Sequence, residues 1–451
     1  MNRTLKRMIT GLGLVLFLAV VAIFCIVITF RRGDNFDPAG PARLAVWFSK
    51  RVVAQASSYL FELYDPYLPG YRYAPTGPPG AGRTGMSGQA MQTCRALQDF
   101  LDDGAAFQGA RVSRFLNWEL PDSHFRFYYQ AADEARLDSL RELYSPAGLK
   151  ARGEDDYLAM AGISRWLHNY FRSRTPGGQV IPRVDFNFNA LDILYRAGQG
   201  ERFWCSEYAT TLVQCLASLG YTARYVMLNS EVGGHVACEA WSESHAKWVL
   251  LDPFYCRRAT LDRVPLNALE VHRLAAEPQA AARVKVIQQA KELTDLHDRA
   301  FYLRLFRNLA VRMRNDWFTN RYPHWYPLSN SVMNAVEWQD ELTCDNIYYR
   351  YETAEAKDLY WPLNRTRVSV LPAGAGCLTV LLETFTPNFS HFRLAEGDNP
   401  TRKLQAGVFE WRLRPGLNLL RVAAVNRWEV AGREAVIEIE WSRARSELAG
   451  L

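Results

Sequence analysis

The sequence predicts an α+β protein with a transmembrane helix near its N-terminus and a β-sandwich near its C-terminus. An uncharged apolar run near the start is long enough to cross a bilayer. Helical periodicity and two adjacent strands occupy the middle of the chain, and short alternating strands fill its end. With 451 residues, 49% of them hydrophobic, the chain is long enough for about two or three domains, and global disorder is excluded.

The apolar run extends from Ile9 to Phe30 and follows a short tail, 1–8. It is too long for the core of a signal peptide, and no small-residue cleavage site follows it. Basic residues flank both of its ends, so their count does not fix the orientation. We expect a single-pass signal anchor at 9–30, with the bulk of the chain outside the cytoplasm.

Charge and cysteine usage exclude two classes of site. The net charge of +6 is modest, and the basic residues are spread along the chain, so we expect no nucleic-acid partner. The eight cysteines include no CxxC pair and no Cys/His cluster with zinc spacing. We therefore expect no metal site and no cofactor.

Shifts in composition divide the rest of the chain. Residues 31–92 form a juxtamembrane segment that ends in a Pro/Gly-rich linker. We expect an α+β catalytic domain over 93–260, a helical connection with an aromatic loop over 261–340, and the β-sandwich over 341–451. Five alternating, β-branched stretches predict the sandwich strands: 366–372, 377–385, 407–414, 418–426 and 434–442.

A cysteine stands at the start of a strongly helical stretch in the middle of the chain. From Cys205 to Leu219, apolar or small residues recur at three- and four-residue steps, and Gly220 occupies the position of a C-cap. The unpaired N–H groups at a helix N-terminus favour the thiolate form of a cysteine. Because free cysteines often only pack, this stretch alone leaves two interpretations open, a core residue or a nucleophile.

A nucleophilic thiol needs a base, and the base needs a group that orients it. His235 opens a predicted strand, 235–241, and Asp252 ends the next one, 247–252. An even-numbered loop between the strands would place His235 and Asp252 on one face of the hairpin, and an odd-numbered loop would place them on opposite faces. Cys205 can join them if the N-terminus of its helix packs on this hairpin.

The order of these residues resembles the transglutaminase-like superfamily, whose members have a papain-like fold and a Cys-His-Asp triad. The resemblance covers 157–255 and includes "LASLGYTARYV" and the Asp-Pro that closes the second strand. It implies Cys205 as nucleophile, His235 as general base and then acid, and Asp252 as the orienting carboxylate. The backbone N–H of Cys205 and one unidentified donor would hold the oxyanion. The chain departs from the family's Gly-x-Cys pattern, because "ERFW" separates Gly200 from Cys205.

Neighbouring side chains have structural interpretations. We expect framework packing rather than the lining of a cleft for Glu239 and Trp241, and packing or pairing rather than reactivity for Cys215, Cys238 and Cys256. We expect the aromatic loop at 317–327 to pack between domains rather than to stack a sugar or peptide. His245 is expected in a solvated turn. Trp204 has two interpretations, one as a wall of an acyl pocket and one as a core aromatic.

We therefore expect a membrane-anchored, cysteine-dependent amide hydrolase or acyltransferase that works through a thioester on peptide or glutamine amides. Hydrolysis, as in a peptidase or amidase, is slightly favoured over cross-linking because water is the simpler acceptor. The expected partners are a protein or peptide substrate, the membrane and, as a further candidate, a cell-envelope polymer. The alternative is a non-catalytic binding or assembly module for a cell-surface polymer or a protein, which the intact triad disfavours.

Overall fold

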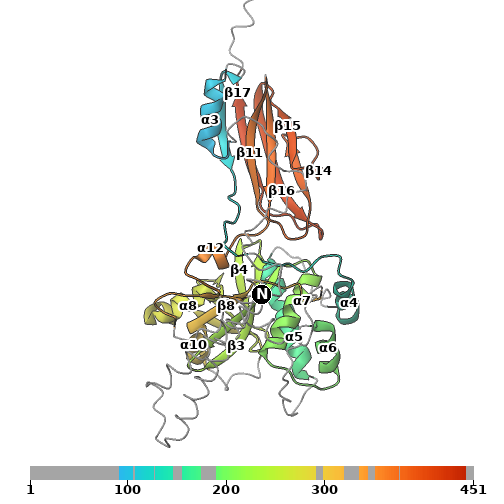
Figure 1. The fold of residues 1–451 in the computed structure, drawn as a ribbon, viewed down its shortest axis with the longest axis vertical. Coiled ribbons are helices and arrows are strands. Elements are labelled where there is room, and N and C mark those ends of the chain that lie inside the picture. The colour runs from blue at the N-terminus through green and yellow to red at the C-terminus, as the bar shows by residue number, and fades with distance from the viewer. Residues whose placement is uncertain are drawn as a thin grey trace, which may run out of the picture.

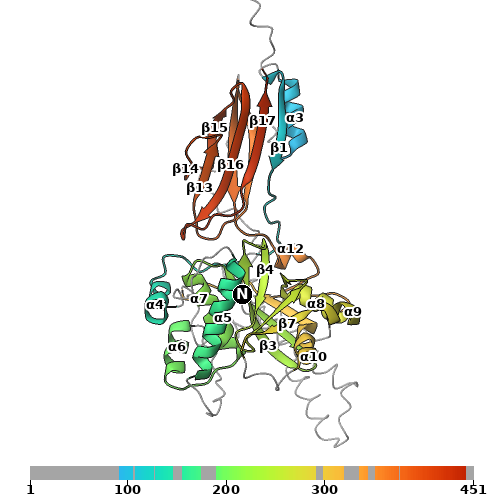
Figure 2. The same cartoon turned by 180° about the vertical axis from the view of Figure 1, so that it is seen from behind.

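A computed structural model describes most of the chain after residue 90 as two bodies, one above the other (Figures 1 and 2). The described residues are 91–104, 107–125, 127–145, 155–173, 189–290, 298–318, 335–343, 351–374 and 376–442. The predicted tail, the predicted anchor at 9–30 and nearly all of segment 31–92 lie outside the described residues.

The predicted fold class requires a correction. It included a membrane-spanning helix, but none of the helices in the described part of the chain is both long and apolar enough to cross a bilayer. The longest, α5 (Asp156–Ser173), has 18 residues and carries charged side chains at both ends and in its middle. The described fold is a mixture of helices with mainly antiparallel sheets.

The body at the top of Figure 1 consists of two antiparallel sheets that enclose one apolar core. The first has the order β1-β17-β16-β13-β14, with bounds Ala110–Leu116, Ala435–Trp441, Gly416–Asn426, Phe389–Glu396 and Arg402–Leu404. The second has the order β11-β12-β15, with bounds Thr366–Gly374, Cys377–Thr384 and Val408–Arg412. The five predicted stretches overlap β11, β12, β15, β16 and β17, whereas β1, β13 and β14 are additional strands.

The first strand of this upper body comes from a distant part of the sequence. β1 pairs with β17, and helix α3 (Cys94–Asp103) packs on β1. Both elements belong to the segment 93–260 that we expected to form the catalytic domain. Val112 of β1 fills the same core as Ile437 and Ile439 of β17, so tertiary burial rather than a local pattern assigns β1 to this body.

The lower body is built on a six-stranded sheet with the order β10-β9-β8-β2-β3-β4. Its strands are, in that order, Tyr351–Thr353, Ala335–Trp338, Asn308–Arg312, Ala223–Ser230, Gly233–Ser242 and Lys247–Leu251. All its pairs are antiparallel except that of β9 with β10. Because β10 lies in segment 341–451, this segment contributes to the lower body as well as to the upper one.

Helices lie on both sides of this sheet (Figures 1 and 2). One side carries α5 together with α4, α6 and α7, with bounds Ala135–Tyr144, Ala190–Gly198 and Cys205–Ser218. The other carries α8 (Ala268–Ala276), α10 (Arg299–Arg304) and the 3₁₀ turn η4 (Leu305–Arg307). The remaining elements are α9 (Pro278–Arg283), α12 (Ala356–Leu359) and a small sheet of β6 (Val264–Pro265), β5 (Arg257–Leu261) and β7 (Lys285–Gln288).

The segment 261–340 is not the helical connection that we expected. Its described residues include the short helices α8, α9 and α10, but also β6, β7, β8 and β9. All five residues of β8 are buried, because β8 lies between β2 and β9. Its side chains contribute to the core of the lower body, so pairing with β2 outweighs the local helical pattern.

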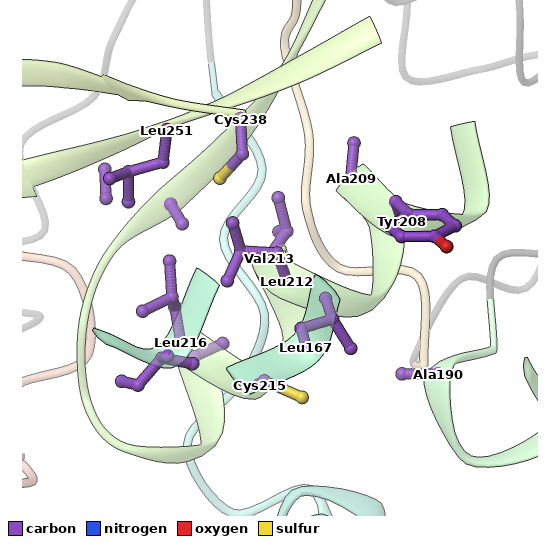
Figure 3. Packing of buried hydrophobic residues seen from close by; sticks show 14 of the residues in the cluster. Leu167, Ala190, Tyr208, Ala209, Leu212, Val213, Cys215, Leu216, Cys238 and Leu251 are labelled. Atoms are coloured by element: carbon purple, nitrogen blue, oxygen red, sulfur yellow. The ribbon is translucent and has the colours of Figure 1, made fainter. Parts of the chain in front are cut away.

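Helix α7 is the central helix of the lower body. Every residue from Ser206 to Ser218 is buried, and Figure 3 shows Leu212 and Val213 among side chains of α5, β3 and β4. Gly220 adopts a positive φ of 83° just after the helix, as the sequence predicts for its end. This packing fixes the N-terminus of α7, where Cys205 lies.

Candidate active site

Cys205 is the first residue of α7, and its side chain is half-buried. At this position its backbone N–H precedes the first hydrogen bonds of the helix and points out of the helix end. The side chain of Glu207 closes the helix start, because its Oε2 accepts hydrogen bonds from the backbone N–H of Trp204 (3.2 Å) and the hydroxyl of Ser206 (2.6 Å). Burial raises the pKa of Glu207.

The register of the β3–β4 hairpin places His235 and Asp252 on one face. Ser242 pairs with Lys247, which leaves an even-numbered turn, 243–246, between the strands. The condition that we derived from the sequence is therefore met. Nε2 of His235 lies 2.7 Å from Oδ2 of Asp252, and both side chains are buried.

The turn after β4 fixes the Asp252 carboxylate. Its Oδ1 accepts hydrogen bonds from the backbone N–H groups of Phe254 (3.1 Å) and Tyr255 (2.9 Å). The backbone of Asp252 also exchanges two hydrogen bonds with Arg257. One carboxylate oxygen is thus held by the backbone, and the other faces His235.

The thiol of Cys205 interacts electrostatically with the His235 ring and is one of the groups that raise its pKa. Because Nε2 faces Asp252, the ring nitrogen that remains for the thiol is Nδ1. Burial alone would lower the pKa of His235, but the Asp252 carboxylate and hydrogen bonds to Asp252 and Cys205 raise it to about 10. The imidazolium form of His235 beside the Asp252 carboxylate is therefore favoured near neutral pH.

Aromatic rings surround the imidazole. The ring centroid of Tyr255 lies 4.6 Å from that of His235, and that of Phe254 lies 6.0 Å away. Tyr208, one turn after Cys205, packs edge-on against Phe254 at 5.2 Å. These rings limit the access of water to His235 and strengthen its charge interactions.

Trp204 does not pack in the core. It is 49% exposed, so the interpretation as a core aromatic is wrong, and the interpretation as a wall of an acyl pocket stays a prediction. His245 is half-buried rather than solvated, and its ring lies 5.6 Å from that of Tyr157.

Framework roles hold for the other neighbours. Glu239 is fully buried in an ion pair with Arg224, and Trp241 is buried in the core. All the described cysteines are free thiols, so the three that we expected to pack or pair only pack: Cys215, Cys238 and Cys256. Burial raises the pKa of each of these three thiols, to about 12 in Cys215 and Cys256. The aromatic loop lies largely outside the described residues, although its first residue, Trp317, is buried.

Three site residues were not predicted from the sequence. Glu207 has the position of a capping-box glutamate, but Trp204 in place of Ser or Thr hides the pattern. His168 of α5 is buried and contacts the turn that follows Asp252. Tyr302 of α10 is buried, and burial together with the Asp252 charge raises the pKa of its hydroxyl. Nothing local marks His168 or Tyr302, because only the fold brings them to Asp252.

No protein-family model matches the chain, and no curated protein matches it. Across the described ranges, no group of three or more His, Cys, Asp or Glu side chains is arranged to hold a metal ion. The site is therefore defined by its own geometry, a partly accessible thiol followed by a buried imidazole and a buried carboxylate.

Proposed function

We propose that the protein is a cysteine-dependent enzyme that transfers acyl groups from amides, as the resemblance to the transglutaminase-like superfamily implies. The observation that carries the proposal is the linear arrangement of Cys205, His235 and Asp252. A half-buried thiol at a helix N-terminus interacts electrostatically with an imidazole, and Nε2 of that imidazole lies 2.7 Å from a buried carboxylate. This arrangement has the parts that nucleophilic acyl transfer needs.

In the first half of the reaction, Sγ of Cys205 attacks the carbonyl carbon of an amide. The electron pair of the carbonyl moves to its oxygen, which the backbone N–H of Cys205 can stabilise. When the C–N bond breaks, the imidazolium of His235 gives its Nδ1 proton to the leaving nitrogen. An amine departs, and a thioester on Cys205 remains.

In the second half, His235 is neutral and takes a proton from the acceptor. Water as acceptor gives a carboxylic acid, and an amine as acceptor gives a new amide. In both cases the C–S bond breaks, and the proton taken from the acceptor remains shared between Cys205 and His235. Hydrolysis of peptide or glutamine amides is the simpler of the two reactions because it needs no second substrate site. Asp252 stabilises the imidazolium form of His235 throughout.

A second buried histidine, His272, shows how a structural His–Asp contact differs from the contact between His235 and Asp252. Nε2 of His272 lies 3.1 Å from both carboxylate oxygens of Asp340, and its Nδ1 lies 2.7 Å from the carbonyl oxygen of Phe306. Both ring nitrogens therefore face acceptors that have no nucleophilic chemistry. His235 instead has one ring nitrogen on a carboxylate and interacts with the Cys205 thiol, which supports a catalytic role.

Alkylation of the purified full chain with iodoacetamide tests the proposal. Cys94 is an exposed thiol in the same molecule, so the labelling of Cys205 is measured relative to Cys94 by peptide mass spectrometry. At pH 6 we expect Cys205 to react roughly tenfold faster than Cys94, and His235→Ala to abolish the difference. Equal rates at the two thiols would favour the alternative, a non-catalytic binding or assembly module.

A second assay addresses acyl transfer itself. Glutamine-containing peptides are offered with hydroxylamine, which converts a thioester into a stable hydroxamate. We expect hydroxamate from the unmodified chain and from Cys94→Ala, and none from Cys205→Ala. Hydroxamate formation that survives Cys205→Ala would exclude Cys205 as the nucleophile.

A further inference from the structure

We propose that His168 is a positioning residue, which holds the Asp252 carboxylate in line with His235 through the carbonyl group of Pro253. This inference rests on the proposed function of Cys205 and His235. His168 does not touch the reacting atoms; it acts on the turn that carries Asp252.

The contact between His168 and this turn is short and buried. Nδ1 of His168 lies 3.0 Å from the carbonyl oxygen of Pro253, and the side chain is 2% exposed. Burial lowers the pKa of His168, so the neutral ring with one N–H is favoured. Because Nδ1 faces a carbonyl oxygen, that N–H is on Nδ1 and donates to Pro253.

Movement of the Pro253 carbonyl would move the carboxylate. Asp252 precedes Pro253, and its Oδ1 accepts the N–H groups of Phe254 and Tyr255 on the other side of that proline. Carboxylate and turn therefore form one hydrogen-bonded unit. A donor that fixes the proline carbonyl also fixes the oxygen that faces His235.

The same helix holds the opposite end of the hairpin. Asp156, in the first turn of α5, accepts hydrogen bonds from the hydroxyl of Ser242 and the backbone N–H of Glu243, both at 2.6 Å. Its two carboxylate oxygens are thus directed at the β3–β4 turn. Helix α5 contacts β4 between these two points.

The spacing of the two contacts matches the length of β4. Asp156 and His168 are twelve residues apart, or about 18 Å along a helix. From Lys247 to Pro253 an extended chain covers about 20 Å. Helix α5 thus holds the hairpin at both ends, and His168 is its contact at the catalytic end.

Besides Pro253, the backbone of Phe254 in the same turn also interacts with the His168 ring. Arg172 lies one turn further along α5, the Asp252 carboxylate is on the hairpin, and the ring of Tyr208 on α7 lies 6.4 Å away. Adjacent buried positions of α5, among them Leu167 and Phe171, are apolar. A histidine at this buried position is consistent with its hydrogen bond to Pro253.

Two substitutions of His168 separate the donor from the packing. His168→Phe keeps a ring of similar size but has no N–H. His168→Asn keeps an amide N–H where Nδ1 lies. The matched control is His272→Phe, which removes another buried histidine whose Nδ1 also faces a backbone carbonyl, but at α8, outside the contacts of Cys205.

The readout is the rate of alkylation of Cys205 by iodoacetamide in the full chain, relative to Cys94, between pH 5 and 9. We expect His168→Phe to reduce the rate at pH 6 roughly tenfold and to move the profile to higher pH, because a misaligned carboxylate stabilises the imidazolium less. His168→Asn should stay within about threefold of the unmodified chain. His272→Phe should leave the profile unchanged even where it lowers the melting temperature.

Wild-type rate and profile in His168→Phe would overturn the inference, and so would equal effects of His168→Phe and His272→Phe. If His168→Phe does not fold, His168→Gln replaces it, because its amide reaches beyond the position of Nδ1. His235→Ala, measured in parallel, separates the two proposals. No effect of His235→Ala refutes the proposed function and this inference with it, whereas an effect of His235→Ala without one of His168→Phe refutes only the inference.

Discussion

Replacing Glu239 with glutamine should destabilise the lower body strongly, because it leaves a buried guanidinium without its counter-charge. Glu239 and Arg224 are both fully buried, and Oε2 of Glu239 accepts from Nε (3.0 Å) and Nη2 (2.6 Å) of Arg224. Oε1 accepts from the backbone N–H of Ala268 (2.6 Å) and the hydroxyl of Tyr360 (3.1 Å). All four acceptor contacts of the carboxylate are thus made inside the protein.

The expected loss follows from this geometry. Glutamine can keep an oxygen toward Ala268, but it then turns an NH₂ group toward the guanidinium of Arg224. Removing one partner of a buried ion pair costs about 3–5 kcal/mol of unfolding free energy. The Arg224 guanidinium also lies 4.0 Å from the ring centroid of Trp248, so its displacement would disturb the aromatic core as well.

Urea unfolding followed by circular dichroism measures this loss. The matched control is Asp262→Asn, which breaks an ion pair with Arg283 in which both side chains are more than 60% exposed. We expect less than about 1 kcal/mol for the exposed pair. The double variant Arg224→Met/Glu239→Leu should be more stable than Glu239→Gln, because it leaves no unpaired buried charge. A loss below about 1 kcal/mol in Glu239→Gln would refute the burial of the pair.

Three further predictions concern the site and its support. Asp252→Asn removes the charge that raises the pKa of His235, so burial should then lower that pKa. Alkylation of Cys205 at pH 7 should fall at least about tenfold, and an unchanged rate would exclude the proposed role of the carboxylate. The pKa of His235 is higher in the folded state than its usual value of 6.5. The stability that this histidine contributes is therefore complete below pH 6.5. It is lost as the pH rises toward 10, by up to about 1.4 kcal/mol per pH unit. Urea unfolding at pH 6.5 and pH 9 should show this loss in the unmodified chain but not in Asp252→Asn, and equal losses would contradict it. Leu212 lies on the buried face of α7. Leu212→Ala should lower the free energy of unfolding by about 2–5 kcal/mol in the same assay at pH 7. A loss below about 1 kcal/mol would show that Leu212 is not tightly packed.

Local patterns were sufficient for the elements that carry the site. The periodicity after Cys205 predicts a helix that begins there, and α7 does begin at Cys205. Alternation predicts strands near His235 and Asp252, and the even-numbered turn between them follows from the register. The helix and the strands depend on residues close in sequence, and for this reason the sequence alone could indicate them, whereas the even length of the turn was decided by the register in the structure.

Distant contacts were decided by the tertiary structure alone. β1 joins β17, more than 300 residues away, because both strands fill one apolar core, and no local pattern states which strand a segment will pair with. His168, Tyr302 and the pair of Arg224 with Glu239 acquire their partners in the same way, through burial that brings separate segments together. The sequence by itself determined the candidate side chains for the proposed acyl transfer, a thiol, an imidazole and a carboxylate. Only the packing of α5 and α7 against the β3–β4 hairpin decided how they are oriented, because the position of a carboxylate relative to an imidazole depends on every element that contacts its turn.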